Sequence, residues 1–243
     1  MKVCFPGTAG EIDVSPVEHK FHSSVIIISL KKKILIDYGT KHAPFIDKDL
    51  DSIDALLITH AHPDHYIWTK SEPEGFKKKV YLTKPTYDYG KYKPEDFKII
   101  KTNKTFNIGD IHLEAFDVIH SIRCPAVCYR ISSGNKGLVY APDILDTVQE
   151  KASVFKDIDC LIADGSSLDK NLARRRDGKL FGHSMVKTII NWCKKYSIKR
   201  LIITHCGKQI VSMDKILLKE SLEKYSDKKL KVEVAYDGWN TVV

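Results

Sequence analysis

The feature that most constrains this chain is a histidine-rich segment, residues 60–65, which reads His-Ala-His-Pro-Asp-His and follows the apolar run 55–58 and Thr59. The run predicts a short buried strand, and Pro63 excludes both a helix interior and a central strand for the segment itself. Three of the chain's ten histidines therefore lie with one carboxylate in a loop at a strand end. Scattered histidines are usually solvated loop residues, but clustered imidazoles with a carboxylate are the ligands that borderline divalent metals such as zinc prefer. The segment predicts a metal site.

The spacing H-x-H-x-D-H of this segment also resembles the signature of the metallo-β-lactamase-fold hydrolases. That resemblance implies an α/β fold, a four-layer αββα metallo-β-lactamase-type sandwich with the metal site at one rim. The chain has 243 residues, of which 43% are hydrophobic, and this is enough for one domain with a sizeable core. We therefore expect a single metallo-β-lactamase-like hydrolase domain over residues 1–243.

Three further candidate ligands lie downstream, and each comes at the expected end of a strand. His120 follows the alternating segment 111–118, Asp143 follows the apolar segment 137–140, and His205 follows residues 200–204. Taken alone, His120 would be an ordinary loop histidine and Asp143 a turn or capping residue. By the family resemblance, all three complete the metal centre.

The resemblance implies a centre of two divalent metal ions, roughly 3.5–4 Å apart with a water between them. One metal is expected to bind His60, His62 and His120, and the other Asp64, His65 and His205, with Asp143 bridging the two. Zn²⁺ is the first choice, and Mn²⁺ or Fe would accept the same ligands.

Two more acidic residues are expected to act on the ligands without binding metal. By resemblance, Asp37 at the end of an apolar strand supports the histidine segment. Asp164 ends the apolar segment 160–163. It is expected either to orient a ligand or His183, or to cap its own loop through backbone amides.

Residues 174–184 contain the candidates for substrate binding. Arg174, Arg175 and Arg176 form a basic loop, and His183 precedes a helical apolar pattern at residues 185–193. We expect Ser184 to cap that helix, so that His183 lies just outside a helix N-terminus, where an anion is favoured. The alternative is a structural histidine beside a capping serine.

By resemblance, His183 indicates the phosphodiesterase branch of the family, which includes tRNA-processing ribonuclease Z and the small cyclic-phosphate phosphodiesterases. In that branch a similar histidine contacts the phosphate or protonates the leaving oxygen, while hydroxide held between the metals attacks phosphorus in line. We accordingly expect His183, Asp143 and Asp64 to be the catalytic residues. Ribonuclease Z carries a tRNA-gripping arm between its equivalents of His120 and Asp143, and only 22 residues separate them here. The arm is therefore absent, and the spacing is closer to that of the cyclic-phosphate enzymes.

The expected substrate is a phosphodiester, which includes cyclic phosphates, nucleotides and nucleic acids. A hydrolase of carboxylic esters, lactones or thioesters is the main alternative, because it would use the same metals without requiring His183 or the arginines. A non-hydrolytic relative with one iron would not need all seven ligands. A nucleic-acid-binding protein with an inactive site is the alternative from another class, but such relatives typically lose ligands, and none is missing here.

Composition adds weaker constraints. The chain carries 39 basic and 31 acidic residues, a formal net charge of +8, which permits a polyanionic substrate without demonstrating one. No apolar run approaches the roughly 20 residues that span a bilayer, and the first residues are interrupted too early for a signal peptide. The six cysteines are dispersed, as expected of reduced thiols. We expect a cytoplasmic protein without a membrane partner, and a homodimer is compatible with the sequence.

Overall fold

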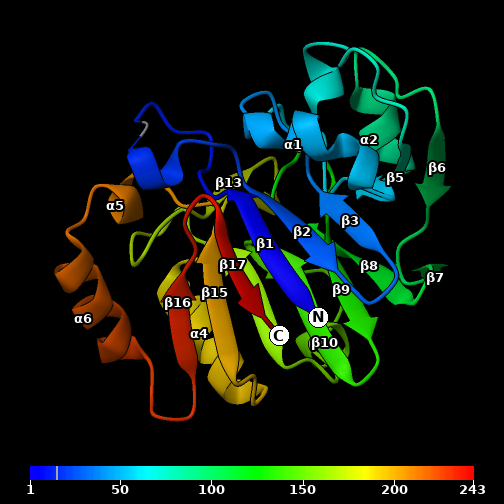
Figure 1. The fold of residues 1–243 in the computed structure, drawn as a ribbon. Helices are drawn as coiled ribbons and strands as arrows, with labels where there is room; N and C mark the ends of the chain where they lie inside the picture. The colour runs from blue at the N-terminus through cyan, green and yellow to red at the C-terminus, as the bar shows by residue number, and fades with distance from the viewer. Residues whose placement is uncertain (15) are drawn as a thin grey trace.

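The computed structural model describes residues 1–14 and 16–243, and two β-sheets form its frame (Figure 1). The first sheet has seven strands, in the spatial order β17 (Trp239–Val242), β1 (Lys2–Gly7), β2 (Ser24–Ile28), β3 (Lys33–Ile36), β4 (Ala55–Leu57), β5 (Lys79–Thr83) and β6 (Phe97–Ile100). The second sheet has eight strands, in the order β11 (Asp146–Thr147), β8 (Ile111–Ile119), β9 (Ala126–Ser133), β10 (Lys136–Ala141), β12 (Cys160–Asp164), β15 (Arg200–Thr204) and β16 (Lys231–Val234), with β7 (Thr105–Ile108) paired to the first part of β8. A separate hairpin consists of β13 (Arg174–Arg176) and β14 (Lys179–Phe181).

Helices cover the outer faces of both sheets. Beside the first sheet lie α1 (Pro44–Asp49), the 3₁₀ helices η2 (Leu50–Ser52) and η3 (Ile67–Thr69), and α2 (Lys84–Tyr89). Beside the second lie α3 (Lys151–Val154), α4 (Val186–Lys195), α5 (Lys208–Val211) and α6 (Lys215–Tyr225), while η1 (Val17–His19) precedes β2. None of the described helices is both long and apolar enough to cross a membrane.

Three hydrophobic clusters separate these layers. The central cluster lies between the sheets and joins Phe5 and Leu57 of the first to Leu113 and Ile162 of the second. In a second cluster, Leu35 of the first sheet packs with residues of α1 and its neighbouring helices. In a third, Ile203 of the second sheet packs with residues of α4 and α6. Helix, sheet, sheet and helix layers follow from these three cores, so the predicted αββα sandwich is confirmed.

The continuous apolar runs of the central strands reflect burial on both faces. In β2, Val25 and Ile27 enter the core between the sheets, while Ile26 enters the core beneath the outer helices. A sheet with one solvated face would show a polar residue at every second position instead. The continuous apolar pattern therefore indicates both that the segment is a strand and that both faces of its sheet are covered.

Two local predictions were wrong, one on the capping residue of α4 and one on the structure of residues 174–179. Ser184 does not cap α4, because the N-cap is Met185 and the backbone N–H of Ser184 donates to the carbonyl of Ile144 at 2.7 Å. Residues 174–179 are not an irregular loop but belong to the β13–β14 hairpin. Its two-residue turn consists of Asp177 and Gly178, whose φ values of +50° and +74° are those of a type I′ turn.

Candidate metal centre

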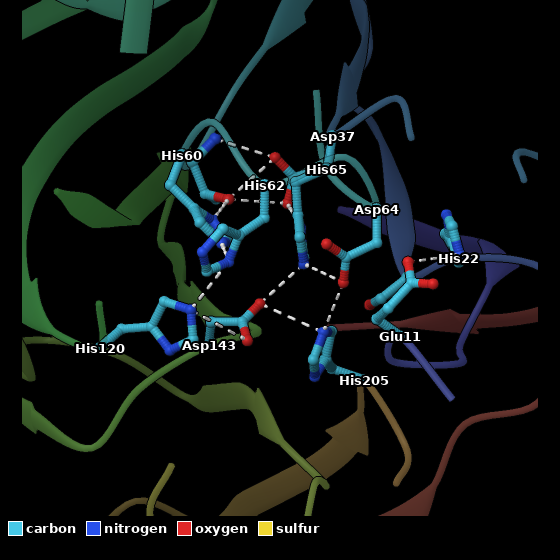
Figure 2. Close-up of polar contacts among 12 residues, drawn as sticks. Glu11, His22, Asp37, His60, His62, Asp64, His65, His120, Asp143 and His205 are labelled. Carbon is cyan, nitrogen blue, oxygen red and sulfur yellow. Dashed lines mark hydrogen bonds and ion pairs between the residues drawn. The ribbon is translucent and has the colours of Figure 1, made fainter. Parts of the chain in front are cut away.

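The candidate ligands gather at one rim because the strands before them run in one direction. In the first sheet β3 and β4 are parallel, and in the second β10, β12 and β15 are parallel to one another. Strand β8 shares that direction, since both β8 and β10 are antiparallel to β9. The carboxyl ends of these strands meet at the same edge of the sandwich, which is where all seven predicted ligands lie (Figure 2).

Three imidazole nitrogens converge in the first group. Nε2 of His60 is 2.8 Å from Nδ1 of His62, and Nε2 of His120 is 3.2 Å from that same Nδ1. His60 and His120 come from different sheets and are 60 residues apart in the chain. The arrangement brings the predicted ligands of one metal within direct contact of one another.

The outer nitrogens of two of these rings have partners that fix the tautomer. Nδ1 of His120 donates to the carbonyl of Gly182 at 3.2 Å, because a carbonyl can only accept. Thr59 donates its hydroxyl proton to Asp37 at 3.0 Å, so it accepts from Nδ1 of His60, also at 3.0 Å. Both inner Nε2 atoms therefore carry lone pairs. Two lone pairs that face Nδ1 of His62 fit a metal cation at this point, because one N–H on that atom could donate well to only one of them.

The same three histidines are held neutral. Burial lowers the pKa of His60 well below its ordinary value, and it lowers the pKa of His62 as well. Burial also lowers the pKa of His120 to about 4. Neutral imidazole is the form that binds metal, so this group is ready to act as a ligand set at neutral pH.

A second group is built from two carboxylates and two imidazoles. Oδ2 of Asp64 is 3.2 Å from Nε2 of both His65 and His205. Oδ2 of Asp143 is 2.7 Å from Nε2 of His65 and 3.3 Å from Nε2 of His205. The other oxygen of Asp143 is 3.7 Å from Nε2 of His120 in the first group. Asp143 thus lies between the two groups, as a bridging carboxylate should.

Two atoms at the centre of the second group are buried without a hydrogen bond. Nε2 of His65 and Oδ2 of Asp143 have no hydrogen-bond partner in residues 1–14 and 16–243, although they lie side by side. Nδ1 of His65 donates to Asp37 at 2.9 Å, so in the neutral ring, the form that binds metal, the lone pair lies on Nε2. Buried polar atoms without a hydrogen bond are costly, and either a proton on Nε2 or a metal cation between the two atoms removes that cost. The donor set of this group fits a divalent metal.

Charges in this group shift the pKa values of its members. Burial lowers the pKa of His65, but the Asp64, Asp143 and Asp37 carboxylates outweigh that effect and raise it well above its ordinary value. Burial raises the pKa of Asp143, and the nearby His205, His120 and His65 bring it well below its ordinary value. The three carboxylates give this part of the rim the negative charge that attracts cations.

Asp37 takes up the supporting position predicted for it. Its side chain is fully buried and accepts from the backbone N–H and hydroxyl of Thr59 and from His65. It adopts a φ of +66°, in the left-handed region that non-glycine residues rarely occupy. With this backbone conformation the carboxylate faces Thr59 and His65, so Asp37 orients two residues of the candidate ligand segment and its flank through hydrogen bonds.

His183 lies at the same rim, held by Asp164. Nδ1 of His183 donates to Oδ2 of Asp164 at 2.8 Å and is 3.4 Å from Oδ1 of Asp143. Burial lowers the pKa of His183, but the charge and hydrogen bond of Asp164 raise it to about 9. Asp164 also accepts from the backbone N–H groups of Ile144 and Ser166, so it both orients His183 and caps its loop. Of the two roles expected for Asp164, the structure shows both.

A pocket of about 470 Å³ opens over these residues. His62, Asp64, His120, Asp143, His183 and His205 line it, together with Glu11, Ile12, Leu172 and Lys208. A pocket of about 550 Å³ lies against α6, but none of the predicted ligands in the described chain borders it. Arg174, Arg175 and Arg176 are exposed on β13 and do not line the pocket over the metal centre. The predicted arginines are therefore near His183 in sequence but outside the inner site.

Sequence reasoning missed three residues at this rim. Ser166 contacts Nδ1 of both His183 and His205, at 3.0 and 3.2 Å. His22 is buried, and its Nε2 is 3.4 Å from the carboxylate of Glu11, which is 64% exposed. No spacing links Glu11 and His22 to the histidine segment. They reach the rim because Ala9 forms β-bridges with both His22 and Cys206.

Comparison with known proteins identifies the family. The family model described as "Beta-lactamase superfamily domain" matches residues 33–206. Exodeoxyribonuclease WalJ from Streptococcus pneumoniae is 27% identical over 162 residues, which cover 61% of this chain and 58% of WalJ. The match thus spans less than two thirds of that relative.

Solved structures confirm the fold. The metallo-β-lactamase fold protein YhfI from Bacillus subtilis has a TM-score of 0.72 at 17% identity, covering 99% of this chain and 98% of YhfI. Zn²⁺-bound PqqB from Methylobacterium extorquens has the same TM-score and identity, with all of both chains covered. Human tRNase Z, short form, has a TM-score of 0.67 at 18% identity, covering 100% of this chain and 99% of the human protein.

Proposed function

This chain belongs to the β-lactamase superfamily, and from the geometry of its rim we propose that it is a dinuclear metal-dependent phosphodiesterase. The coarser assignment, a hydrolase of the metallo-β-lactamase fold with a His/Asp cluster that could hold metals, follows from the family, the fold and the cluster. One observation carries the finer assignment. A histidine held by a buried carboxylate stands 3.4 Å from the carboxylate between the two ligand groups.

The seven residues divide into two ligand sets. We assign His60, His62 and His120 to one cation and Asp64, His65 and His205 to the other, with Asp143 shared. When bound, two divalent cations lower the pKa of a water molecule and neutralise charge on phosphoryl oxygens. Zn²⁺ suits both sets, and Mn²⁺ or Fe would accept the same nitrogen and oxygen ligands.

Asp64 and Asp143 are proposed to orient the attacking water. Burial raises the pKa of Asp64, but His65 and His205 bring it well below its ordinary value, so the carboxylate stays ionised. Asp143 is ionised for a similar reason. Both side chains line the pocket, where an ionised oxygen can accept a hydrogen bond from water and fix its direction of approach.

His183 is proposed to bind a phosphate oxygen or to protonate the leaving oxygen. Because its Nδ1 donates to Asp164, its Nε2 is the nitrogen free for substrate, and the ring lines the pocket. The adjacent carboxylate favours the imidazolium form, which can donate from Nε2. A phosphodiester carries negative charge through the reaction, so a fixed cation stabilises it more than it would a neutral carboxylic ester.

The named relatives support a phosphodiester in the substrate. WalJ is named an exodeoxyribonuclease, and the human structure is a tRNase Z. Both names describe enzymes that cleave phosphodiester bonds in nucleic acid. We propose the same bond class for this chain, acting as one hydrolase domain over residues 1–243.

A comparison of substrates tests the proposal. The purified protein would be loaded with Zn²⁺, its metal content measured, and its turnover of bis(p-nitrophenyl) phosphate compared with that of p-nitrophenyl acetate and a lactone. Two metals per chain with selective phosphodiester turnover are expected. Selective turnover of the carbonyl substrates would overturn the phosphodiesterase assignment and favour an ester, lactone or thioester hydrolase.

A variant pair tests the position of His183. His183→Asn is expected to lower kcat on the phosphodiester by roughly 10²- to 10⁴-fold, the usual contribution of a positioned acid, while two metals remain bound. His112→Asn, at an exposed histidine that contacts Asn107, is the matched control. Equal turnover in both variants would remove His183 from the mechanism.

A further inference from the structure

The β13–β14 hairpin concentrates positive charge at an exposed surface. Arg174, Arg175, Arg176 and Lys179 are all exposed. Within the described chain, the one ion pair involving them is that of Arg176 with Asp177 at 3.6 Å, and those two side chains are 67% and 87% exposed. Such a solvated pair contributes little. The hairpin therefore presents cations that the fold itself does not use.

The register of the hairpin sorts these cations by face. Arg174 pairs with Phe181, Arg175 with Leu180, and Arg176 with Lys179. Cross-strand partners share a face, and successive residues alternate between faces. Arg174, Arg176, Lys179 and Phe181 thus share one face, which we term the cationic face. Arg175 and Leu180 lie on the other face, where the guanidinium of Arg175 donates to the carbonyl of Gly178 at 3.4 Å.

The root of the hairpin is fixed to the metal centre. Gly182 follows β14, and its N–H donates to the carbonyl of His120 at 2.7 Å, while its own carbonyl accepts from that histidine's ring. Gly182 has a φ of +120°, and a Cβ there would lie 2.2 Å from the carbonyl oxygen of Leu172. Only glycine fits this junction. Leu172, just before β13, lines the pocket over the centre, and His183 follows Gly182 directly.

We propose that the cationic face holds a single strand of nucleic acid and leads it into the metal centre. This inference rests on the proposed phosphodiesterase function and names its substrate class. A cyclic phosphate has one phosphate group and needs no second cation outside the pocket. Three cations spread along a hairpin suit a chain of phosphates, and the aromatic ring of Phe181 among them suits a stacked base. A base is free to stack on a side chain when no partner strand covers it, which favours a single strand over a duplex.

Binding of a labelled oligonucleotide to the Zn²⁺-loaded protein tests the proposal. The probe is a fluorescent single strand of about 12 nucleotides, within the usual size of such sites, with phosphorothioate linkages that keep the backbone charge and slow cleavage. The dissociation constant would be measured by anisotropy at several salt concentrations. Replacing Arg174, Arg176 and Lys179 with Ala is expected to reduce the slope of log K against log salt by about 2, since each single-strand phosphate contact contributes about 0.7.

Phe181→Ala should behave differently from the charge variant. Loss of one stacked base is expected to weaken binding roughly 5- to 150-fold, with the salt slope unchanged. Two controls match these changes. A triple variant of Lys219, Lys224 and Lys228 to Ala removes the same charge from α6 and the following turn, and it should alter the dissociation constant by less than about twofold. Arg175→Ala, on the opposite face, should cost less than Arg174→Ala.

Two results would overturn the proposal. One is an equal salt slope in the cationic-face variant and the α6 control, and the other is tighter binding of a duplex of the same length than of the single strand. Either could occur while the protein hydrolyses bis(p-nitrophenyl) phosphate. Failure of this inference is therefore separable from failure of the phosphodiesterase assignment, which loss of that hydrolysis in the metal-loaded wild type would show.

Discussion

At the scale of single residues, one buried carboxylate sets the tautomers of histidines in both ligand groups. Asp37 accepts from Nδ1 of His65 directly, and through the hydroxyl of Thr59 it fixes Nδ1 of His60. In the neutral rings that bind metal, each contact places the lone pair on the Nε2 atom that faces the centre. Partners of this kind strengthen ligand histidines and hold their rings in place. Asp37 therefore couples the two proposed metals without touching either.

Asp37→Asn tests this coupling. Asparagine keeps the size of the side chain and tolerates the φ of +66° that the position requires. The backbone N–H of Thr59 donates to Oδ1 and His65 donates to Oδ2, and an amide has only one oxygen, so the variant loses one of these two contacts and with it part of the support of the histidine segment or of the His65 ring. We expect a loss of bound metal on dialysis and a fall in turnover of roughly 10- to 100-fold. Metal analysis and phosphodiester turnover would be measured on the same samples.

The matched control for this variant is Asp110→Asn. Asp110 also accepts from side chains, the hydroxyls of Ser29 and Ser133, but it lies far from the rim at the turn before β8. Full metal content in Asp37→Asn, equal to that of the control, would show that the tautomers do not depend on this carboxylate.

The candidate ligands and the two supporting carboxylates Asp37 and Asp164 could be predicted from sequence, whereas the hydrogen bonds that hold them could not. Each ligand follows an apolar strand, and strand ends are visible as runs that stop at a polar residue. The contact of Thr59 with Asp37 spans 22 residues and depends on the pairing of β3 with β4. Ser166 reaches two histidines for a similar reason. No local pattern encodes such contacts, because the partner strand is chosen by the whole fold.

At the scale of elements, the N-terminal segment 8–10 closes the rim behind His205. The N–H of Cys206 donates to the carbonyl of Thr8 at 2.7 Å, and the N–H of Gly10 donates to the carbonyl of Cys206 at 3.1 Å. Asp237 in turn accepts from the hydroxyl of Thr8 at 2.7 Å. His205 adopts a φ of +51°, which these neighbouring contacts hold in place. The candidate ligand His205, at the end of β15, is thus positioned by residues near the N-terminus.

Gly10→Ala should disturb this ligand selectively. A Cβ at Gly10 would lie 2.9 Å from Cε1 of His205, so the imidazole must move. We expect the affinity for the second metal to fall by about tenfold or more, as it does when a ligand's support is lost, while the first metal stays bound. Metal titration would measure both. Gly75→Ala is the control, because its Cβ meets nothing within 4 Å although its φ of +67° strains the backbone. Equal second-metal affinity in the two variants would contradict the steric argument.

A second element-level contact ties the edges of the two sheets. Arg200 of β15 donates to Glu233 of β16 at 2.7 Å and, across the sandwich, to the hydroxyl of Thr241 and the carbonyl of Val242 in β17. Burial raises the pKa of Glu233, but hydrogen bonds from Lys231 and Arg200 bring it below its ordinary value of 4.5. The stability that this pair provides is therefore present above pH 4.5 and is lost as the pH falls through the lower pKa of the folded state.

Arg200→Ala is expected to lower the free energy of unfolding by about 1–2 kcal/mol at pH 7, a discounted value for charged hydrogen bonds that are partly exposed. The difference in unfolding free energy between Arg200→Ala and the wild type should shrink below pH 4.5, because protonated Glu233 no longer forms an ion pair with Arg200. Urea unfolding at several pH values would measure it. A deficit that stays constant down to pH 3 would assign the effect to the contacts with β17 alone.

The hairpin shows where element prediction from sequence reaches its limit. Three consecutive arginines lack the β-branched and aromatic residues that indicate a strand, so the sequence predicts a loop over residues 174–179. The signal that was available is Asp177-Gly178, a two-residue turn of the kind that joins antiparallel strands. The Asp177-Gly178 turn and the junction at Gly182 hold these short, exposed strands in place. Neither feature produces an alternating hydrophobic pattern in the sequence.

At the scale of the whole molecule, the proposed metals would join the two halves of the sandwich. Residues 60–65 extend from the first sheet, whereas His120, Asp143 and His205 extend from the second. Each ligand set draws on both sheets. The sequence could predict that strands end in ligands, but the joining of the sheets follows from the central core of Phe5, Leu57, Leu113 and Ile162.

Metal binding should therefore stabilise the fold as well as support catalysis. A ligand that binds only the folded state adds about 2.7 kcal/mol at a free concentration 100 times its dissociation constant. For a chain of this size, each kcal/mol corresponds to roughly 2–4 °C in Tm. Adding Zn²⁺ to the chelator-treated protein, at 100 times the dissociation constant of each of the two proposed sites, should raise Tm by about 10–20 °C, as measured by calorimetry. His112→Ala, at an exposed histidine outside the rim, should show the same rise. Asp143→Ala should lose most of it, because both sets lose their shared carboxylate; an undiminished rise in that variant would mean that Asp143 does not bridge the metals.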